Sequence, residues 1–166
     1  FQAHALAFLN GLYHGVFAMD PQFPGVVGAS ANLGVVEEES GALRVRIFLR
    51  AAREEDEAEL AGRHAALGAE HGFTVRVSGY PGWPGARNNP LARVLERVWR
   101  EQTGRSLEIG AVHTGLEPSV LRAKAPALTM VSTGPEILDA HSVDERAPLD
   151  GLADYALLLA GTMEAL

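Results

Sequence analysis

The first part of the chain alternates between hydrophobic and polar positions as strands of a small sheet do. Residues 26–36 are mostly small, β-branched and apolar, which predicts a strand. From Leu43 to Leu49 apolar and polar side chains take alternate positions, which predicts a second, half-buried strand. The polar stretch 37–41 between them is typical of a hairpin loop, so we expect the two strands to pair antiparallel.

A charged helix and a third strand are expected next. Residues 53–70 are rich in Ala, Glu and Arg and contain no Pro, which predicts a surface helix with Leu60, His64 and Leu67 on its inner stripe. Residues 73–77 alternate again and predict a strand. The order strand, strand, helix, strand makes up most of a split βαβ unit, with an α+β architecture.

A Pro- and Gly-rich segment at residues 80–85 indicates a change of architecture. After it, Asn89 as N-cap and Pro90 at the first helical position predict a helix that ends at Gly104. Short apolar runs at 107–112 and 128–132 predict strands. Strands that alternate with helices indicate a mainly parallel α/β sheet.

A final helix is expected to begin at Asp150 as its cap. Its predicted inner stripe consists of Leu152, Tyr155, Ala156, Leu159 and Met163. At the other end of the chain, residues 4–12 are expected to be the end of a helix, which Gly11 and Gly15 interrupt.

Composition restricts the classes of function. The chain has 166 residues, of which 47% are hydrophobic and 21% charged, and a formal net charge of -7, which argues against nucleic-acid binding. It has no cysteine, which excludes disulfides, thiolate metal sites and cysteine nucleophiles, and is compatible with the cytoplasmic location that we expect. No apolar run approaches the roughly 20 residues that a membrane-spanning helix needs. Because the sequence begins at Phe1 without an initiator Met, we expect a fragment or a trimmed chain.

The first candidate site is the segment from His113 to Glu117. A His and a Glu bracket Gly115 directly after a predicted strand, where loops of α/β proteins usually build sites. Gly115 would let the backbone approach a ligand closely. The alternative, which we consider equally favoured, is a solvated turn with a helix that starts near Glu117.

The second candidate site is the segment from His141 to Glu145, in a long loop after residues 129–132. One ring nitrogen of His141 could bind zinc while Asp144 or Glu145 accepts a hydrogen bond from the other. The alternative is a helix-capping box in which Ser142 reaches Glu145. Both interpretations could hold together.

Two further residues are weaker candidates. Arg50 ends the second predicted strand and could bind a substrate carboxylate through two parallel hydrogen bonds. The alternative is that Arg50 is only solvated, as an Arg at a strand end usually is. His14 lies in a predicted loop and is ambiguous. His64, on the inner stripe of a predicted helix, is expected to serve packing.

Five segments, in order, resemble motifs of the aminoacyl-histidine dipeptidases, the carnosine-cleaving branch of the M20 zinc metallopeptidases. These segments are His14–Met19, the Ser-x-Asn strand Ser30–Val36, Tyr80–Trp83 with Asn89–Leu91, His113–Glu117, and Val131–Pro135 with His141–Glu145. The chain departs from the family pattern at several positions, among them Thr114 in place of Ala and Val143 in place of Pro. These departures bear on substrate preference more than on family membership.

The resemblance implies an incomplete zinc-peptidase architecture of two parts. Residues 1–79 would be the later part of a ferredoxin-like lid, and residues 80–166 the C-terminal part of an α/β catalytic domain. It also implies that the complete protein hydrolyses Xaa-His or related dipeptides with water activated by two zinc ions.

The resemblance assigns roles to single residues. His141 would be a zinc ligand, and His113 and Glu117 would lie near the substrate. With the candidates considered above, the expected substrate contacts are His14, Arg50, His113, Gly115 and Glu117. The general base and the other zinc ligands are expected upstream of Phe1. Because one His cannot hold a catalytic zinc ion, we expect the full site not to form and the chain alone to be inactive.

Other functions remain open at this point. One is a different M20 amidohydrolase, either an amino-acid deacylase or a carboxypeptidase. Another is a non-catalytic module that forms a homodimer through the lid sheet, because the strand at 26–36 could be an exposed edge. A third is a degenerate protein that never had the missing ligands. The expected partner is a small dipeptide, with no nucleic acid and no membrane.

Overall fold

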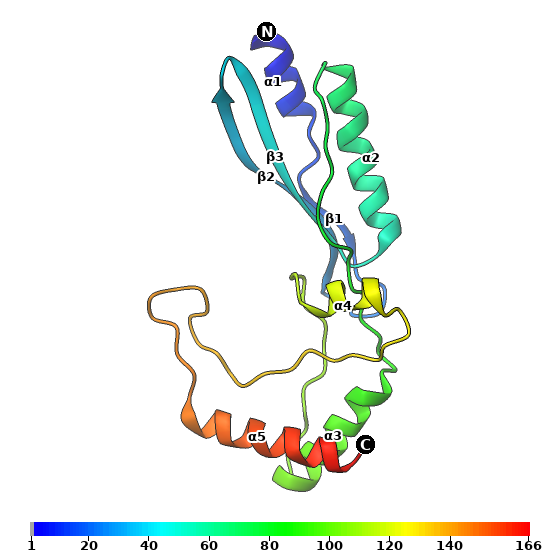
Figure 1. Ribbon diagram of the computed structural model, residues 1–166, viewed down its shortest axis with the longest axis vertical. Coiled ribbons are helices and arrows are strands. Elements are labelled where there is room, and N and C mark those ends of the chain that lie inside the picture. Colours follow the sequence, from blue (N-terminus) through cyan, green and yellow to red (C-terminus); the bar gives the residue numbers. More distant parts are fainter. Residues whose placement is uncertain (1) are drawn as a thin grey trace. The chain divides into compact units, whose positions relative to one another are not determined.

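The computed structural model describes residues 2–166 of the chain, which divide into two compact units (Figure 1). The first unit comprises residues up to 86 together with 111–126, and the second comprises 87–110 together with 127–166. The helices are α1 (Gln2–Gly11), α2 (Glu54–Glu70), α3 (Pro90–Thr103), α4 (Pro118–Lys124) and α5 (Leu149–Glu164). The strands are β1 (Gly15–Met19), β2 (Val27–Glu39) and β3 (Ala42–Ala51). The domain boundary at residues 79 and 80 stays a prediction.

The first unit is built on an antiparallel sheet with the strand order β1-β2-β3. The expected hairpin of β2 and β3 is confirmed, but its turn is shorter than predicted. Glu37 to Glu39 belong to β2 and pair with β3, and the chain turns at Ser40 and Gly41 with φ angles of 53° and 76°. Two successive residues with positive φ are typical of the tight turn that suits the twist of a hairpin. Strand β1 was not predicted.

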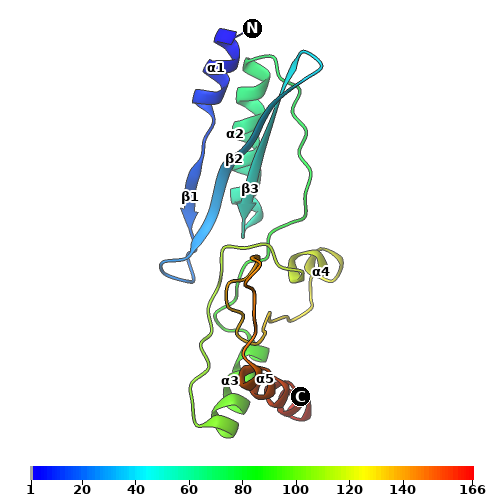
Figure 2. The same ribbon diagram turned by 90° about the vertical axis from the view of Figure 1, so that its left-hand side faces the viewer.

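One face of the sheet is buried under α2, and α1 lies beside α2 (Figure 2). The core of this layer consists of Ala29, Ala31, Ala51 and Leu60. The period-two alternation predicted for β3 is confirmed, because Leu43, Val45, Ile47 and Leu49 are half-buried and the residues between them are exposed. Ser30 and Arg50 take positions of the opposite parity, on the face away from α2.

His64 serves packing, as expected. It is buried, with Nδ1 2.7 Å from the Leu60 carbonyl oxygen and Nε2 3.0 Å from the Tyr13 carbonyl oxygen. The ring therefore ties α2 to the segment that precedes β1, and it takes no part in a site.

A bidentate ion pair between Arg53 and Asp56 lies at the start of α2. The guanidinium of Arg53 donates from Nε and Nη2 to the two carboxylate oxygens of Asp56, at 2.9 and 2.8 Å. This hydrogen bond and the charge of Arg53 lower the pKa of Asp56, although burial of the carboxyl opposes the shift. Asp56 is buried while Arg53 is half exposed, so solvent screens part of the attraction.

Replacing Asp56 with Asn is expected to lower the midpoint of thermal unfolding by a few degrees at pH 7, because the paired carboxylate is lost. A carboxyl with a lowered folded pKa stabilises the fold above its unfolded value of about 3.9. That contribution disappears as the pH falls through the lower folded pKa. The difference between wild type and Asp56→Asn should therefore vanish in acid. Glu55→Gln, which removes a charge from the same turn, should show a much smaller difference, and equal effects of both variants would contradict the role of the ion pair.

The second unit is organised by α3 and α5. Helix α3 has the predicted ends: Asn89 Oδ1 accepts from the backbone N–H groups of Leu91 and Ala92, and Gly104 ends the helix with a φ of 69°. Helix α5 differs from the prediction. Pro148, and not Asp150, is its N-cap, and its buried residues are Leu158 and Thr162.

The expected stripe of α5 is displaced because α3 is the helix against which α5 packs within this unit. Leu158 contacts the buried residues Leu95 and Val98 of α3, and Tyr155 packs against the same cluster. Leu152, Leu159 and Met163, predicted to face inward, are exposed by 40%, 38% and 77%. An apolar helix face without a partner stays on the surface.

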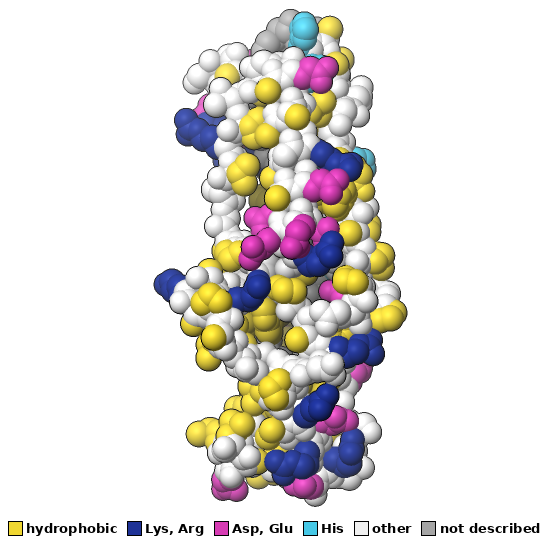
Figure 3. All heavy atoms as spheres, turned by 90° about the vertical axis from the view of Figure 1, so that its right-hand side faces the viewer, with side chains coloured by type: hydrophobic (Ala, Val, Ile, Leu, Met, Phe, Trp, Pro, Cys, Tyr) yellow, Lys and Arg dark blue, Asp and Glu magenta, His cyan; other side chains and the backbone are white. Residues whose placement is uncertain are grey.

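Three predicted strands do not form. Residues 73–77, 107–112 and 128–132 lie outside every helix and strand, and the described residues contain no parallel strand pair. A strand needs a neighbour that accepts and donates its backbone hydrogen bonds, and the described chain provides none for these segments. Some of their apolar side chains remain exposed, among them Val77 at 68% and Val112 at 67%, whereas Leu107 and Val131 are half-buried against α3 and α5. Hydrophobic side chains are likewise scattered over the face shown in Figure 3.

Within the described residues, the helices are too short or too polar to cross a bilayer.

Candidate functional site

The strongest concentration of candidate residues lies on the outer face of the sheet in the first unit. Val16, Ser30 and Arg50 form one row across the three strands, because Val16 pairs with Ser30 and Ser30 pairs with Arg50. His113 lies against this row. Its Nε2 is 2.6 Å from the hydroxyl of Ser30, and Arg50 donates from Nη1 to its carbonyl oxygen at 3.3 Å.

The surroundings of His113 favour the neutral imidazole. Partial burial is the largest cause that lowers its pKa, the positive charge of Arg50 adds to this, and a backbone contact with Val27 opposes it. From an ordinary value near 6.5, a lowered pKa leaves the ring uncharged at pH 7. Arg50 forms no ion pair within the described part of the chain, so its guanidinium is available for an anion.

The Tyr-Pro-Gly-Trp segment packs against the same residues. Gly115 lies so close to Tyr80 that a side chain at position 115 would overlap the Tyr80 hydroxyl. Gly82 approaches the carbonyl oxygens at the end of β3 equally closely, and Arg122 of α4 donates to the Gly82 carbonyl at 3.4 Å. The motif at 80–83 and the motif at 113–117 therefore meet at the end of β3.

Two of the predicted substrate contacts lie apart from this arrangement. Glu117 is exposed and precedes α4 without a side-chain capping bond, which is the geometry of the solvated turn weighed as its alternative. His14 is exposed directly before β1, and no hydrogen bond of its side chain is observed. The structure thus brings together Arg50, His113 and Gly115, while Glu117 and His14 remain predictions.

His141 lies in the second unit, in a tightly closed loop. Its backbone N–H donates to Glu145 Oε2 at 2.7 Å, and Arg146 donates to Asp139 Oδ2 at 2.5 Å. Asp139 and His141 both have positive φ, 52° and 65°, which is uncommon for residues other than Gly and is frequent at functional sites. Glu145 therefore accepts a hydrogen bond from the backbone of His141. We had expected Asp144 or Glu145 to accept a hydrogen bond from its ring.

The alternative of a helix-capping box is wrong, because no helix begins at Ser142. The Ser142 hydroxyl instead donates to the Asp139 carbonyl oxygen at 2.7 Å, and the loop is closed by a bridge between Leu138 and Arg146. Among residues 2–166, no three His, Asp or Glu side chains are close enough to hold a metal ion.

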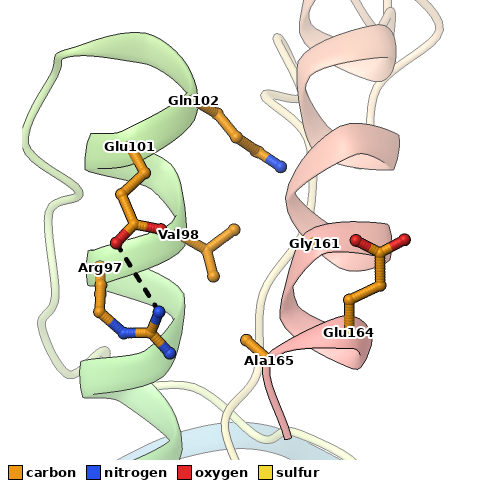
Figure 4. A pocket seen from close by; sticks show the side chains of 7 residues that line it. All are labelled: Arg97, Val98, Glu101, Gln102, Gly161, Glu164 and Ala165. Atoms are coloured by element: carbon orange, nitrogen blue, oxygen red, sulfur yellow. Dashed lines mark ion pairs between the residues drawn. The ribbon is translucent and has the colours of Figure 1, made fainter.

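A shallow hollow between α3 and α5 offers no comparable chemistry (Figure 4). Its charged side chains lie mainly along α3, where Arg97 and Glu101 are 3.7 Å apart, and Gln102 donates across the hollow to the Leu157 carbonyl at 2.9 Å. Gly161 lets the two helices approach closely, because a Cβ atom there would lie 2.5 Å from Gln102 Nε2 and 2.9 Å from Val98 Cγ1. The hollow belongs to helix packing.

Sequence reasoning missed two residues of the site, Ser30 and Tyr80. Ser30 is the polar residue between the buried Ala29 and Ala31. This pattern indicates which face of the strand Ser30 occupies, but not which residues lie next to it. The pairing with Arg50 depends on strand register, and the contact with His113 joins residues 83 positions apart. Neither can be obtained from local sequence patterns.

The chain is 27% identical over 155 residues to the cytosol non-specific dipeptidase of Escherichia coli strain K12. Its structure is similar to that of the aminoacylhistidine dipeptidase from Vibrio alginolyticus, with a TM-score of 0.84, 27% identity and 99% of this chain covered. It also shares the fold of the aminopeptidase PepT from Bacillus cereus, with a TM-score of 0.75 and 19% identity over 98% of this chain. No protein-family model matches the chain.

The matches cover the chain almost completely but the relatives only partly. The aligned region spans 93% of this chain and 32% of the Escherichia coli dipeptidase, and the corresponding shares of the Vibrio and Bacillus chains are 34% and 44%. This chain therefore spans about a third of the length of its dipeptidase relatives.

Proposed function

Because this chain is homologous to dipeptidases of the M20 peptidase family, we propose that it forms part of a longer dipeptidase and supplies residues that bind the substrate. The observation that carries the proposal is the convergence of Arg50, His113 and Gly115 on the outer face of the sheet. His113 and Gly115 come from one sequence motif, and Arg50 lies at the strand end that was considered as a site for a substrate carboxylate.

The arrangement suits the free carboxylate of a peptide. The Arg50 guanidinium can donate two parallel hydrogen bonds to a carboxylate. The neutral ring of His113 adds a polar partner that does not compete with Arg50 for the negative charge of the carboxylate. Gly115 has no side chain of its own to keep a ligand from its backbone, although the Tyr80 hydroxyl covers one side of it. A dipeptide is the substrate that this site favours, and an Xaa-His dipeptide is the first to test.

Zinc would depend mainly on residues outside this chain. We propose His141 as one ligand, and the described residues contain no group of three His, Asp or Glu side chains that could hold a metal ion. The role of this chain is then to bind and orient the substrate, and residues 1–166 alone should not hydrolyse peptides. The proposed location is cytoplasmic. A homodimer through the sheet of the first unit remains part of the proposal, but through β1 or β3, because β2 is the central strand and not the expected edge.

The test is hydrolysis of β-alanyl-histidine and several α-dipeptides by the longer protein and by residues 1–166 alone, each with and without a chelator. We expect chelator-sensitive cleavage by the longer protein only. Robust cleavage by residues 1–166 would overturn the proposed division of roles. Cleavage of acyl amino acids in place of dipeptides would favour an M20 deacylase.

Replacing Arg50 with Ala in the longer protein is expected to raise KM for a dipeptide by about tenfold to a hundredfold. This range follows from a charged hydrogen bond worth about 1.5–3 kcal/mol. The same substitution should barely affect a dipeptide whose carboxyl group is converted to an amide. Arg46→Ala is the matched control, because Arg46 occupies the same face of β3 but pairs with Glu37. If Arg50→Ala impairs the acid and the amide equally, the carboxylate is bound elsewhere.

A further inference from the structure

We infer that Ser30 is a positioning residue of this site: its hydroxyl holds the imidazole of His113, and with it the segment 113–115, in place against β2. The functional part of this inference rests on the proposed function of the site, while the structural part does not. Ser30 would act on the substrate only through His113.

The contact itself is short and selective. The Ser30 hydroxyl and His113 Nε2 are 2.6 Å apart, and both residues are half-buried. A hydroxyl can donate to or accept from a ring nitrogen, so it suits either tautomer of a neutral imidazole. Because one ring nitrogen is held by Ser30, the orientation of the ring and the direction of the other nitrogen are fixed.

The position of Ser30 in the sheet makes the hydroxyl rigid. Its neighbours Ala29 and Ala31 are buried against α2, with exposed fractions of 0% and 3%. Their burial fixes the backbone of β2 and directs the Ser30 side chain to the opposite face, toward His113. Arg50, paired with Ser30 across the sheet, holds the backbone carbonyl of the same His. Two adjacent strands therefore fix His113 at two points.

No backbone ladder secures the segment that carries His113. Residues 107–117 lie outside the strands and helices, and α4 begins only at Pro118. Its attachment to the sheet consists largely of contacts with Ser30, Arg50 and the backbone of Val27, and Tyr80 of the segment 80–83 lies against Gly115. Loss of the Ser30 contact should therefore change the position and protonation of His113 without unfolding the sheet.

The first test is nitrogen NMR of the His113 ring in residues 1–166, comparing wild type with Ser30→Ala and Ser30→Thr. We expect Ser30→Ala to change the ring nitrogen shifts and to move the titration midpoint of His113. Ser30→Thr, which keeps the hydroxyl, should restore both. Ser78→Ala, an exposed serine of the same unit, should change neither. Unchanged His113 signals in a folded Ser30→Ala variant would overturn the inference.

The second test is a double-mutant cycle in the longer protein, read as kcat/KM for a dipeptide. Ser30→Ala should reduce kcat/KM about tenfold, as the loss of one hydrogen bond implies. His113→Ala should reduce it at least as far, and the double variant should be no worse than His113→Ala alone. Additive losses would mean that Ser30 acts independently of His113, which contradicts a positioning role. If the longer protein hydrolyses no dipeptide, the proposed function fails, while the NMR result still decides whether Ser30 holds His113.

Discussion

Replacing Gly82 with Ala is expected to destabilise the first unit by at least about 2 kcal/mol. A Cβ atom at this position would overlap the carbonyl oxygen of Ala51 and lie 2.7 Å from that of Ala52. Both obstacles are backbone atoms at the end of β3, so the clash cannot be relieved by a change of rotamer. The segment 80–83 would have to move away from the sheet. Urea unfolding followed by circular dichroism measures the loss.

Gly79→Ala is the matched control for this prediction. Among the described residues, apart from its two neighbours in the chain, no atom lies within 4 Å of the position that a Cβ atom at Gly79 would take. The substitution therefore meets no obstacle. It should leave stability unchanged or raise it slightly, because Ala restricts the unfolded chain more than Gly does. If both variants unfold at the same urea concentration, the close approach of Gly82 to β3 does not exist in solution.

The displacement of segment 80–83 should also reach the candidate site. Tyr80 lies against Gly115, and Arg122 reaches the Gly82 carbonyl, so the segment supports the backbone on which His113 lies. Gly82→Ala should therefore change the NMR signals of His113 under conditions where the sheet is still folded. Gly79→Ala should leave those signals at their wild-type positions.

Replacing His141 with Ala in the longer protein is expected to lower kcat/KM for dipeptides by at least about a hundredfold. Removal of a residue that merely supports a metal ligand costs about tenfold to a hundredfold, so removal of a ligand should cost more. Zinc content, measured by elemental analysis, should fall in parallel. His4→Ala, at an exposed histidine, should alter neither quantity.

A second variant is needed because the backbone of His141 is itself unusual. Its φ of 65° is strained for Ala, so a loss of activity in His141→Ala could come from the loop and not from the ring. His141→Asn tolerates this conformation but offers no imidazole. Equal losses in both variants assign the effect to the ring. Full activity and full zinc content in His141→Asn would make His141 a loop residue without a role in metal binding.

The sequence by itself determined those elements whose stabilising contacts are local. The helix at 90–103 is specified by Asn89, Pro90 and Gly104, which terminate it regardless of what surrounds it. The strand of residues 42–51 follows from strict alternation, since one sheet face is covered by α2 and the other is open. The resemblance to dipeptidases also rested on local motifs, and the comparisons confirm it.

The segments at 73–77, 107–112 and 128–132 have the local pattern of strands but do not form them. Strand formation depends on a neighbouring chain, and a local pattern carries no information about whether that neighbour is present. The inner stripe of α5 was misplaced for the same reason, because only packing on α3 decides which of its apolar faces is buried.

Tertiary structure alone decided how the candidate site is assembled. Ser30, Arg50 and His113 are distant in sequence and meet only because β2 and β3 pair in one register and residues 111–117 cross their outer face. A shift of one residue in that register would place Ser30 and Arg50 on opposite faces. The register is fixed by burial of Ala29, Ala31 and Ala51 under α2, so the packing of the core determines which polar side chains meet on the other side of the sheet.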